Sequence, residues 1–281
     1  MELCQCAISN DIKIGHIRCR NAISPSKIPG VKYCLNPYVG CEHGCIYCYA
    51  VFMKRFTEHS EEWGKFVDTK LGFVKRLSVQ LGETKPGTLM LGTVTDAYQP
   101  LEAEMKLTRR CLELLAGRDL EVHIQTKSDL VLRDLDLLKK IKNCWVGFTI
   151  TTPDQEMARQ FEPRACEVSR RLKALRILNR NQIRTFAFVG PILPAFSDNA
   201  ESLRELFREL KLTGTDKIYI DRMHYWGDRW MRIRSFVENH HPQFLDYYQW
   251  SRNNYRQYSD KLKDIIRRSL IGMDLDCEVV F

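Results

Sequence analysis

The sequence predicts an α/β protein with a parallel sheet that is either doubly wound or closed towards a barrel. Two observations support this fold class. Short apolar runs, typical of buried strands, alternate with stretches of helical periodicity from residue 33 to residue 220. Polar residues gather just after the apolar runs. Because both architectures place ligands at the carboxyl ends of their strands, these polar residues mark the expected site.

Strand and helix units alternate along the central part of the chain. A first strand begins near Tyr33, and apolar runs predict five more strands at residues 88–94, 120–125, 145–151, 184–192 and 217–220. Helical spacing of apolar residues predicts helices at residues 101–115, 130–141, 168–178 and 200–210. Residues 1–32 are polar and interrupted by prolines, which predicts an extension that wraps the surface. Residues 277–281 could add a last edge strand.

The composition is that of an ordinary globular protein. An apolar content of 44% in 281 residues is enough to bury a full core. No run approaches the ~20 apolar residues of a membrane helix, and residues 1–15 lack the apolar segment of a signal peptide. We therefore expect a cytoplasmic protein outside the membrane, whose eleven cysteines are reduced thiols or metal ligands. The net charge of +8 favours anionic partners without identifying one.

Three of these cysteines lie close together, between a predicted strand and a predicted helix. Cys41, Cys45 and Cys48 follow the pattern C-x3-C-x2-C. The spacing favours a cubane iron–sulfur cluster over zinc, because a structural zinc site usually has paired C-x2-C units and a fourth Cys or His ligand. A cluster held by three thiolates leaves one iron open. The other cysteines near the N-terminus show no spacing typical of metal ligands, and we expect them to be unligated thiols: Cys4, Cys6, Cys19 and Cys34.

The sequence around the three cysteines resembles the cluster loop of the radical S-adenosylmethionine enzymes. The stretch NPYVGCEHGCIYCYA at residues 36–50 is similar to the branch that includes spore photoproduct lyase. Further segments recur in the same order as in that lyase, at residues 92–96, 126–127, 148–150 and 161–163, with Arg171 and Pro191. The resemblance covers roughly residues 30–222. It implies a partial (β/α)6 TIM-type barrel at residues 33–222, an N-terminal extension at residues 1–32 and a C-terminal helical extension at residues 223–281.

The resemblance also implies the cofactors. Cys41, Cys45 and Cys48 would hold a [4Fe-4S] cluster, and the open iron would bind S-adenosyl-L-methionine. One electron, from a donor such as ferredoxin or flavodoxin, would then cleave this molecule to methionine and a 5′-deoxyadenosyl radical.

Carried over by position, several residues would bind S-adenosyl-L-methionine. Tyr47 would contact the adenine, and the methionine moiety would be bound by Thr95, Lys127 and Thr149. Further candidates for the same role are Asp96, Glu162 and Arg164. An ion pair within the protein would explain Glu162 and Arg164 equally well, and Asp96 could instead cap a turn before Pro100.

Two residues bear on the reaction itself. Thr93 stands where spore photoproduct lyase has a hydrogen-donating cysteine, two positions before Thr95. For this reason the sequence does not predict repair of a DNA photoproduct. Tyr49 matches a tyrosine of the radical relay in that lyase, although simple packing would also explain a tyrosine beside a cluster.

The region from residue 222 to residue 270 has its own composition, with ten Lys or Arg, five Asp or Glu and ten aromatic residues. It could contact phosphates and stack bases, or form a helical lid whose aromatic residues are core. The aromatic candidates are Tyr225, Trp226, Trp230, Tyr247, Tyr248, Trp250 and Tyr255. The basic candidates are Arg229, Arg232, Arg234, Arg252, Arg267 and Arg268.

Together these features predict a radical enzyme that abstracts hydrogen from an unidentified substrate, with a nucleic acid or nucleotide as the main hypothesis. Within the same class of enzymes, the rival substrate is a peptide or a small metabolite. From a different class, the alternative is a non-enzymatic iron–sulfur or zinc protein that binds nucleic acid.

Overall fold

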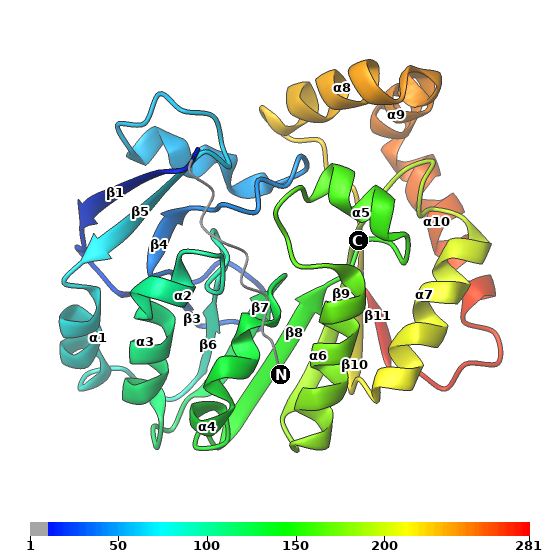
Figure 1. The fold of residues 1–281 in the computed structure, drawn as a ribbon. Helices are drawn as coiled ribbons and strands as arrows, with labels where there is room; N and C mark the ends of the chain where they lie inside the picture. Colours follow the sequence, from blue (N-terminus) through cyan, green and yellow to red (C-terminus); the bar gives the residue numbers. More distant parts are fainter. Residues whose placement is uncertain (1–10) are drawn as a thin grey trace.

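The structure is a computed structural model of the chain and describes residues 11–281. Its main feature is a curved sheet of eight strands in the order β11-β10-β9-β8-β7-β6-β3-β2, with helices along its outer side (Figure 1). Neighbouring strands pair in parallel, except for β2 and β3. In the described part of the chain no pairing joins the two edges, β11 and β2. The sheet is therefore a partial barrel, which confirms the predicted fold class.

The six central strands are those predicted from the sequence, and β11 is the predicted edge strand. The strands of this sheet are β2 (Ile23–Pro25), β3 (Tyr33–Leu35), β6 (Thr88–Leu91), β7 (Glu121–Thr126), β8 (Asn143–Thr149), β9 (Arg184–Ile192), β10 (Lys217–Arg222) and β11 (Cys277–Val279). Their side chains alternate between the two faces. In β7, for example, Val122 and Ile124 are buried in the main core, whereas Gln125 lies on the inner face and lines a cavity.

The outer face of the sheet is covered by helices whose apolar sides form the main core. The helices of the chain are α1 (Phe73–Leu81), α2 (Glu102–Met105), α3 (Leu107–Leu115), α4 (Leu135–Leu138), α5 (Gln155–Phe161), α6 (Val168–Arg180), α7 (Ala200–Thr213), α8 (Arg229–His240), α9 (Leu245–Asn253) and α10 (Tyr255–Ser269). Three short 3₁₀ helices complete them in the described part of the chain: η1 (Tyr49–Phe56), η2 (Asp129–Asp134) and η3 (Pro242–Phe244). Within residues 11–281, no helix is long and apolar enough to span a bilayer.

Two of the predicted helices are interrupted. The helix expected at residues 101–115 is divided at Lys106, whose φ of 51° is left-handed. The carboxylate of Glu102 explains the break, because it accepts the N–H groups of Thr108 at 2.9 Å and Arg109 at 3.2 Å and so caps the start of α3. The helix expected at residues 130–141 is instead η2 followed by the single turn of α4.

A second, three-stranded sheet was not predicted. Its strands are β1 (Lys13–Arg18), β5 (Phe66–Leu71) and β4 (Tyr38–Gly40), in the order β1-β5-β4. Within the segment expected to wrap the surface, residues 13–18 thus form a strand that pairs in parallel with β5. The antiparallel pairing of β4 with β5 matters for the site, because β4 ends at Gly40 and the three-cysteine segment begins at the next residue.

Candidate active site

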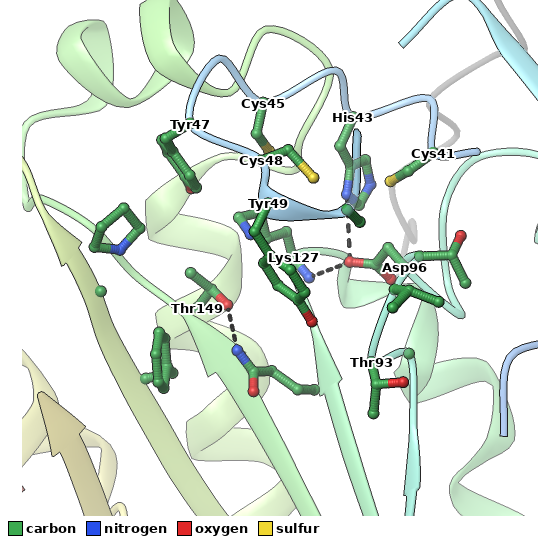
Figure 2. A pocket seen from close by; sticks show the side chains of 18 of the residues that line it. Cys41, His43, Cys45, Tyr47, Cys48, Tyr49, Thr93, Asp96, Lys127 and Thr149 are labelled. Carbon is green, nitrogen blue, oxygen red and sulfur yellow. Dashed lines mark hydrogen bonds and ion pairs between the residues drawn. The ribbon is translucent and has the colours of Figure 1, made fainter. Parts of the chain in front are cut away.

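A cavity of about 500 Å³ lies at the carboxyl ends of the strands, beneath the segment of residues 41–48, which we call the cysteine loop (Figure 2). This volume is typical of small-molecule sites. Ten of the twelve predicted site residues line the cavity: Cys41, Cys45, Tyr47, Cys48, Tyr49, Thr93, Thr95, Asp96, Lys127 and Thr149. The structure therefore brings together residues that are more than one hundred positions apart in the sequence.

The cysteine loop is folded by its own backbone. The N–H of Gly44 donates to the carbonyl of Cys41 at 3.3 Å, and the N–H of Cys48 donates to the carbonyl of Cys45 at 3.1 Å. Gly44 has a φ of 62°, and its Cα lies so close to Gly64 that a Cβ added to Gly64 would be 2.7 Å from it. The two glycines therefore let the loop pack backbone to backbone against the segment before β5.

The three thiols fit an iron–sulfur cluster better than a single zinc ion. All three are free cysteines that line the cavity. Among residues 11–281, no three His, Cys, Asp or Glu side chains are arranged to hold a single ion. A cluster does not need such convergence, because its thiolates bind different irons, whereas zinc draws its ligands to one point. No other cysteine in the described chain lines the cavity, so the fourth iron of a cubane would have no thiolate.

Burial changes the acidity of two of these thiols. It raises the pKa of Cys41 well above the ordinary value and the pKa of Cys45 to about 12. Both groups are therefore protonated at neutral pH when no metal is bound. Cluster assembly must release these protons, because the thiolate is the ligand. Of the other cysteines considered in the sequence, Cys19 and Cys34 are free thiols, and Cys4 and Cys6 lie outside the described residues.

Asp96 joins the cysteine loop to the end of β7. Its Oδ2 lies 3.3 Å from His43 Nδ1 and accepts the backbone N–H of Lys127 at 2.8 Å. Its Oδ1 accepts the Thr126 hydroxyl at 2.7 Å and the backbone N–H of Tyr98 at 2.9 Å. Burial alone would raise the pKa of Asp96, but the attraction of His43 and these hydrogen bonds lower it to about 2. Asp96 is thus an ionised turn cap that also holds the site together.

Lys127 has the only ammonium group on the cavity wall within residues 11–281. This ammonium forms no hydrogen bond or ion pair with another described residue. Its Nζ lies 5.6 Å from the centre of the Tyr47 ring. Burial opposes its charge, but the attraction of Glu162 and of Cys45 in its thiolate form, the form that binds a metal, outweighs burial and raises the pKa of Lys127. The group is a cation directed at a cavity and is available to an anionic ligand.

The three predicted threonines all have protein partners. The Thr95 hydroxyl donates to the carbonyl of Gly40 at 2.6 Å. The hydroxyls of Thr93 and Thr149 accept hydrogen bonds, each at 2.9 Å, from Asn36 and Gln125 respectively. Because a hydroxyl can accept and donate at once, Thr93 and Thr149 each keep a hydrogen for a ligand.

The remaining two predicted residues, Glu162 and Arg164, do not line this cavity. Glu162 is buried behind Tyr47, where its carboxylate accepts the tyrosine hydroxyl and lies 2.6 Å from Nη1 of Arg171. Arg164 donates to the carbonyl of Gly64 at 2.6 Å and pairs with Asp11 at 2.9 Å. In both cases the structure shows the ion pair that was the alternative interpretation. Both residues support the cysteine loop from behind, Glu162 through the Tyr47 hydroxyl and Arg164 by donating to the carbonyl of Glu42 at 3.3 Å.

Several cavity residues were missed by the sequence analysis. Gln125 was detectable, because the alternation of β7 places it on the inner face one residue before the strand ends. His224 follows β10 in a segment without periodicity and gave no signal. The same is true of Trp63, which reaches the cavity wall from the segment before β5.

Most aromatic residues of the C-terminal region belong to the core. Tyr225, Trp230 and Tyr248 pack in one buried cluster with Tyr47 and Phe161. The hypothesis that these rings stack bases is therefore wrong for the buried members. Of the seven aromatic candidates, only Trp226 and Tyr255 are exposed, with 78% and 48% of their surface accessible. Of the six basic candidates, only Arg229 lines the cavity.

Comparison with known proteins gives one family and several relatives. Residues 35–220 match the Radical SAM superfamily. A protein of Methanocaldococcus jannaschii, described as uncharacterised, is 31% identical over 273 residues, covering 96% of this chain and 99% of its own length. A protein of Acidianus two-tailed virus, described in the same way, is 28% identical over 238 residues, covering 76% of this chain and 78% of its own.

Solved structures share the fold at low identity. Spore photoproduct lyase with bound AdoMet and dinucleoside spore photoproduct has a TM-score of 0.72 and 17% identity, over 95% of this chain and 81% of the lyase. SuiB of Streptococcus suis bound to S-adenosylmethionine has a TM-score of 0.55 and 10% identity, over 88% of this chain and 50% of SuiB. These matches show the fold, and the family match spans most of the described sheet. The chain therefore belongs to the radical SAM superfamily.

Proposed function

We propose that the protein cleaves S-adenosyl-L-methionine reductively and uses the resulting radical to abstract hydrogen from a substrate in the same cavity. The observation that carries this proposal is the placement on a single cavity wall of three free thiols and one ammonium that is unpaired among residues 11–281. When bound, a [4Fe-4S] cluster would supply the electron and an open iron for the methionine part of the cofactor. Cys41, Cys45 and Cys48 would hold it.

The residues of the chain would bind and orient the cofactor. The Lys127 ammonium would pair with the carboxylate of the methionine moiety, for which its free donors are suited. Thr149 would donate its remaining hydrogen to the same moiety, while Gln125 fixes the position of the hydroxyl. Tyr47 would contact the adenine, and its own hydroxyl is held by Glu162. A cofactor held in this way places its reactive carbon beside one substrate hydrogen and excludes water.

Two further residues at the cavity bear on the fate of the substrate radical. Tyr49 is half exposed and lines the cavity, where its ring is reachable by a ligand. Thr93 offers an alcohol in place of a thiol, and the O–H bond of an alcohol, unlike that of a phenol such as Tyr49, is too strong to serve as an easy hydrogen donor. The product radical must therefore be quenched by another group or undergo further chemistry. For this reason we do not propose repair of a thymine photoproduct.

A nucleic acid or nucleotide is the proposed substrate class, and a peptide is the second candidate. Spore photoproduct lyase has been solved with a dinucleoside spore photoproduct, and SuiB with the precursor peptide SuiA. The present chain favours the first class, because two arginines, Arg222 and Arg229, line its cavity. A one-electron donor such as ferredoxin or flavodoxin would reduce the cluster.

The test is anaerobic reconstitution of the full chain with iron and sulfide, followed by dithionite and S-adenosyl-L-methionine. We expect four irons per chain and formation of 5′-deoxyadenosine, measured by chromatography. Cys45→Ala should lose both the cluster and the product. Cys277→Ala is the matched control, because Cys277 is a half-buried free thiol on the edge strand β11. If the wild type forms no more 5′-deoxyadenosine than Cys45→Ala, the proposed function is wrong.

A further inference from the structure

The end of β10 and the connection to α8 add a second group of polar residues to the cavity. Arg222, His224, Trp226 and Arg229 all line it, and none of them comes from the strands that position Lys127 and Thr149. In the sheet, β9 separates β10 from β8. The Lys and Arg side chains of the cavity therefore come from two places, the end of β7 and the segment from β10 to the start of α8. Of these side chains, only Lys127 has a proposed role in binding S-adenosyl-L-methionine.

Both arginines carry unused hydrogen-bond donors. The Nε atoms of Arg222 and Arg229 are buried and have no hydrogen-bond partner in the described part of the chain. Within residues 11–281 each guanidinium donates instead to a backbone carbonyl, Arg222 to Met223 at 3.2 Å and Arg229 to His224 at 2.9 Å. A buried donor without a partner costs about 1–3 kcal/mol. Both side chains are only half-buried, so a turn of the guanidinium toward a ligand acceptor would recover this cost.

The charges of the two arginines are also uncompensated. Neither guanidinium forms an ion pair with a carboxylate of residues 11–281, although Asp221 lies beside them and attracts Arg229. Asp221 is instead engaged by His224, whose Nε2 lies 3.0 Å from its Oδ1, and by the backbone N–H of Arg222 at 2.9 Å. Burial lowers the pKa of Arg229. Because a partly buried cation without a counter-ion is costly, the site favours an anionic ligand.

Exposed aromatic rings lie next to these guanidinium groups. Trp226 is 78% exposed and its ring packs at 5.8 Å against His224, which fixes it at the cavity wall. The guanidinium of Arg229 lies 5.8 Å from the centre of the Tyr49 ring, which is half exposed. The Arg222 guanidinium lies 5.4 Å from the centre of the Tyr255 ring, which does not line the cavity. A cavity whose wall includes an exposed indole and two arginines suits a ligand that has both a flat ring and a phosphate. A peptide carboxylate would use the arginines but not the exposed rings.

We propose that Arg222 and Arg229 bind the phosphate group of a nucleotide substrate, whose base packs on Trp226. This assignment rests on the proposed function, since it names the substrate class of the same cavity. His224 is a positioning residue, because its carbonyl accepts from Arg229 and its ring contacts Trp226.

The experiment measures ligand binding to the reconstituted full chain by titration calorimetry. The probes are thymidine 5′-monophosphate, thymidine and inorganic phosphate, each in the presence of S-adenosyl-L-methionine without reductant. We expect the monophosphate to bind at least tenfold more tightly than thymidine, and Arg222→Gln and Arg229→Gln each to weaken it about tenfold. Trp226→Ala should weaken the monophosphate but not inorganic phosphate. Arg234→Gln is the matched control, since Arg234 is an exposed residue of α8 that lies near Glu238 and does not line the cavity.

The outcomes separate this inference from the proposed function. Formation of 5′-deoxyadenosine with dithionite and no substrate tests the proposed function in the wild type and should be unchanged in Arg234→Gln. If the wild type cleaves S-adenosyl-L-methionine but binds the monophosphate no better than thymidine, the phosphate assignment is wrong and the proposed function stands. Equal weakening in Arg234→Gln would show a general charge effect and would also overturn the assignment.

Discussion

The Nδ1 atom of His43 lies 3.3 Å from Oδ2 of Asp96, and both side chains are almost completely buried. This contact joins the cysteine loop, which follows β4 of the small sheet, to the turn that follows β6 of the large sheet. The same carboxylate accepts two hydrogen bonds from the end of β7. One ionised group therefore fixes the cysteines relative to Lys127, the residue proposed to bind the methionine carboxylate.

Replacing this carboxylate should loosen the cluster site. Asp96→Asn keeps the size of the side chain but removes its charge, so the attraction of His43 is lost and one acceptor becomes a donor facing the N–H of Lys127. We expect a loss of about 1–3 kcal/mol in the free energy of unfolding, and fewer irons per chain after reconstitution. Asp136→Asn is the control, because Asp136 is an exposed partner of Arg109. Full iron content in Asp96→Asn would contradict the positioning role.

The acidity of Asp96 also predicts a dependence on pH. Its pKa falls from an ordinary 3.8 to about 2 in the folded chain, so the folded state favours the ionised form. The resulting stability, about 2 kcal/mol, is present above pH 4 and is lost as the pH falls towards 2. Urea unfolding of the metal-free chain between pH 6 and pH 2.5 measures it. The stability difference between wild type and Asp96→Asn should shrink over the acid end of this range, and a constant difference would refute the prediction.

The sequence was informative wherever a residue's role depends on its place along the chain. The alternation of apolar runs with helical spacing predicted the six parallel strands, and predicted polar residues after these strands line one cavity. The cysteine spacing and the resemblance gave the family. What the sequence could not supply depends on three-dimensional contacts. The pairing of Glu162 with Arg171 and that of His43 with Asp96 each need two segments to meet in space. No local pattern specifies such contacts.

In the C-terminal region, amino-acid composition alone could not distinguish a binding surface from a packed lid. Its aromatic and basic residues were compatible with a nucleic-acid surface or with a packed lid. Burial decided between them, since Tyr248 has no accessible surface and Trp226 has 78%. The helical spacing of aromatic residues does not distinguish a core face from a binding face, because both need rings at the same intervals.

Lys127 should be required for cofactor affinity and not for the fold. Its ammonium has no hydrogen-bond or ion-pair partner among the described residues, so Lys127→Met removes a charge without leaving another group unpaired. We expect S-adenosyl-L-methionine to bind about tenfold more weakly or worse, because a charge-assisted hydrogen bond is lost. Equilibrium dialysis of the reconstituted chain measures this affinity. Lys173→Met, on the exposed side of α6, is the control. Unchanged affinity in Lys127→Met would mean that another group binds the carboxylate.

Gly64→Ala should disturb the cysteine loop from a distance. Gly64 has a φ of 98°, and a Cβ there would meet the Cα of Gly44 at 2.7 Å. The substitution combines backbone strain with a backbone clash, so the loop must shift away from the segment before β5. We expect lower iron content and slower 5′-deoxyadenosine formation. Gly117→Ala separates strain from contact, because Gly117 has a φ of 76° but nothing within 4 Å of the added Cβ. If both variants lose iron equally, the contact with the cysteine loop is not the cause.

Two tryptophans four positions apart should differ in how much their replacement by alanine lowers the free energy of unfolding. Trp230 is buried, packs edge-on against Tyr225 at 5.5 Å and belongs to the same buried cluster as Tyr47. Trp230→Ala should therefore cost about 3–5 kcal/mol of unfolding free energy, because it leaves a large cavity behind the cysteine loop. Trp226→Ala should change stability by no more than about 0.5 kcal/mol, since its ring is exposed. Urea denaturation monitored by circular dichroism measures both. A large loss of unfolding free energy in Trp226→Ala would contradict the prediction. It would mean that this ring supports the fold.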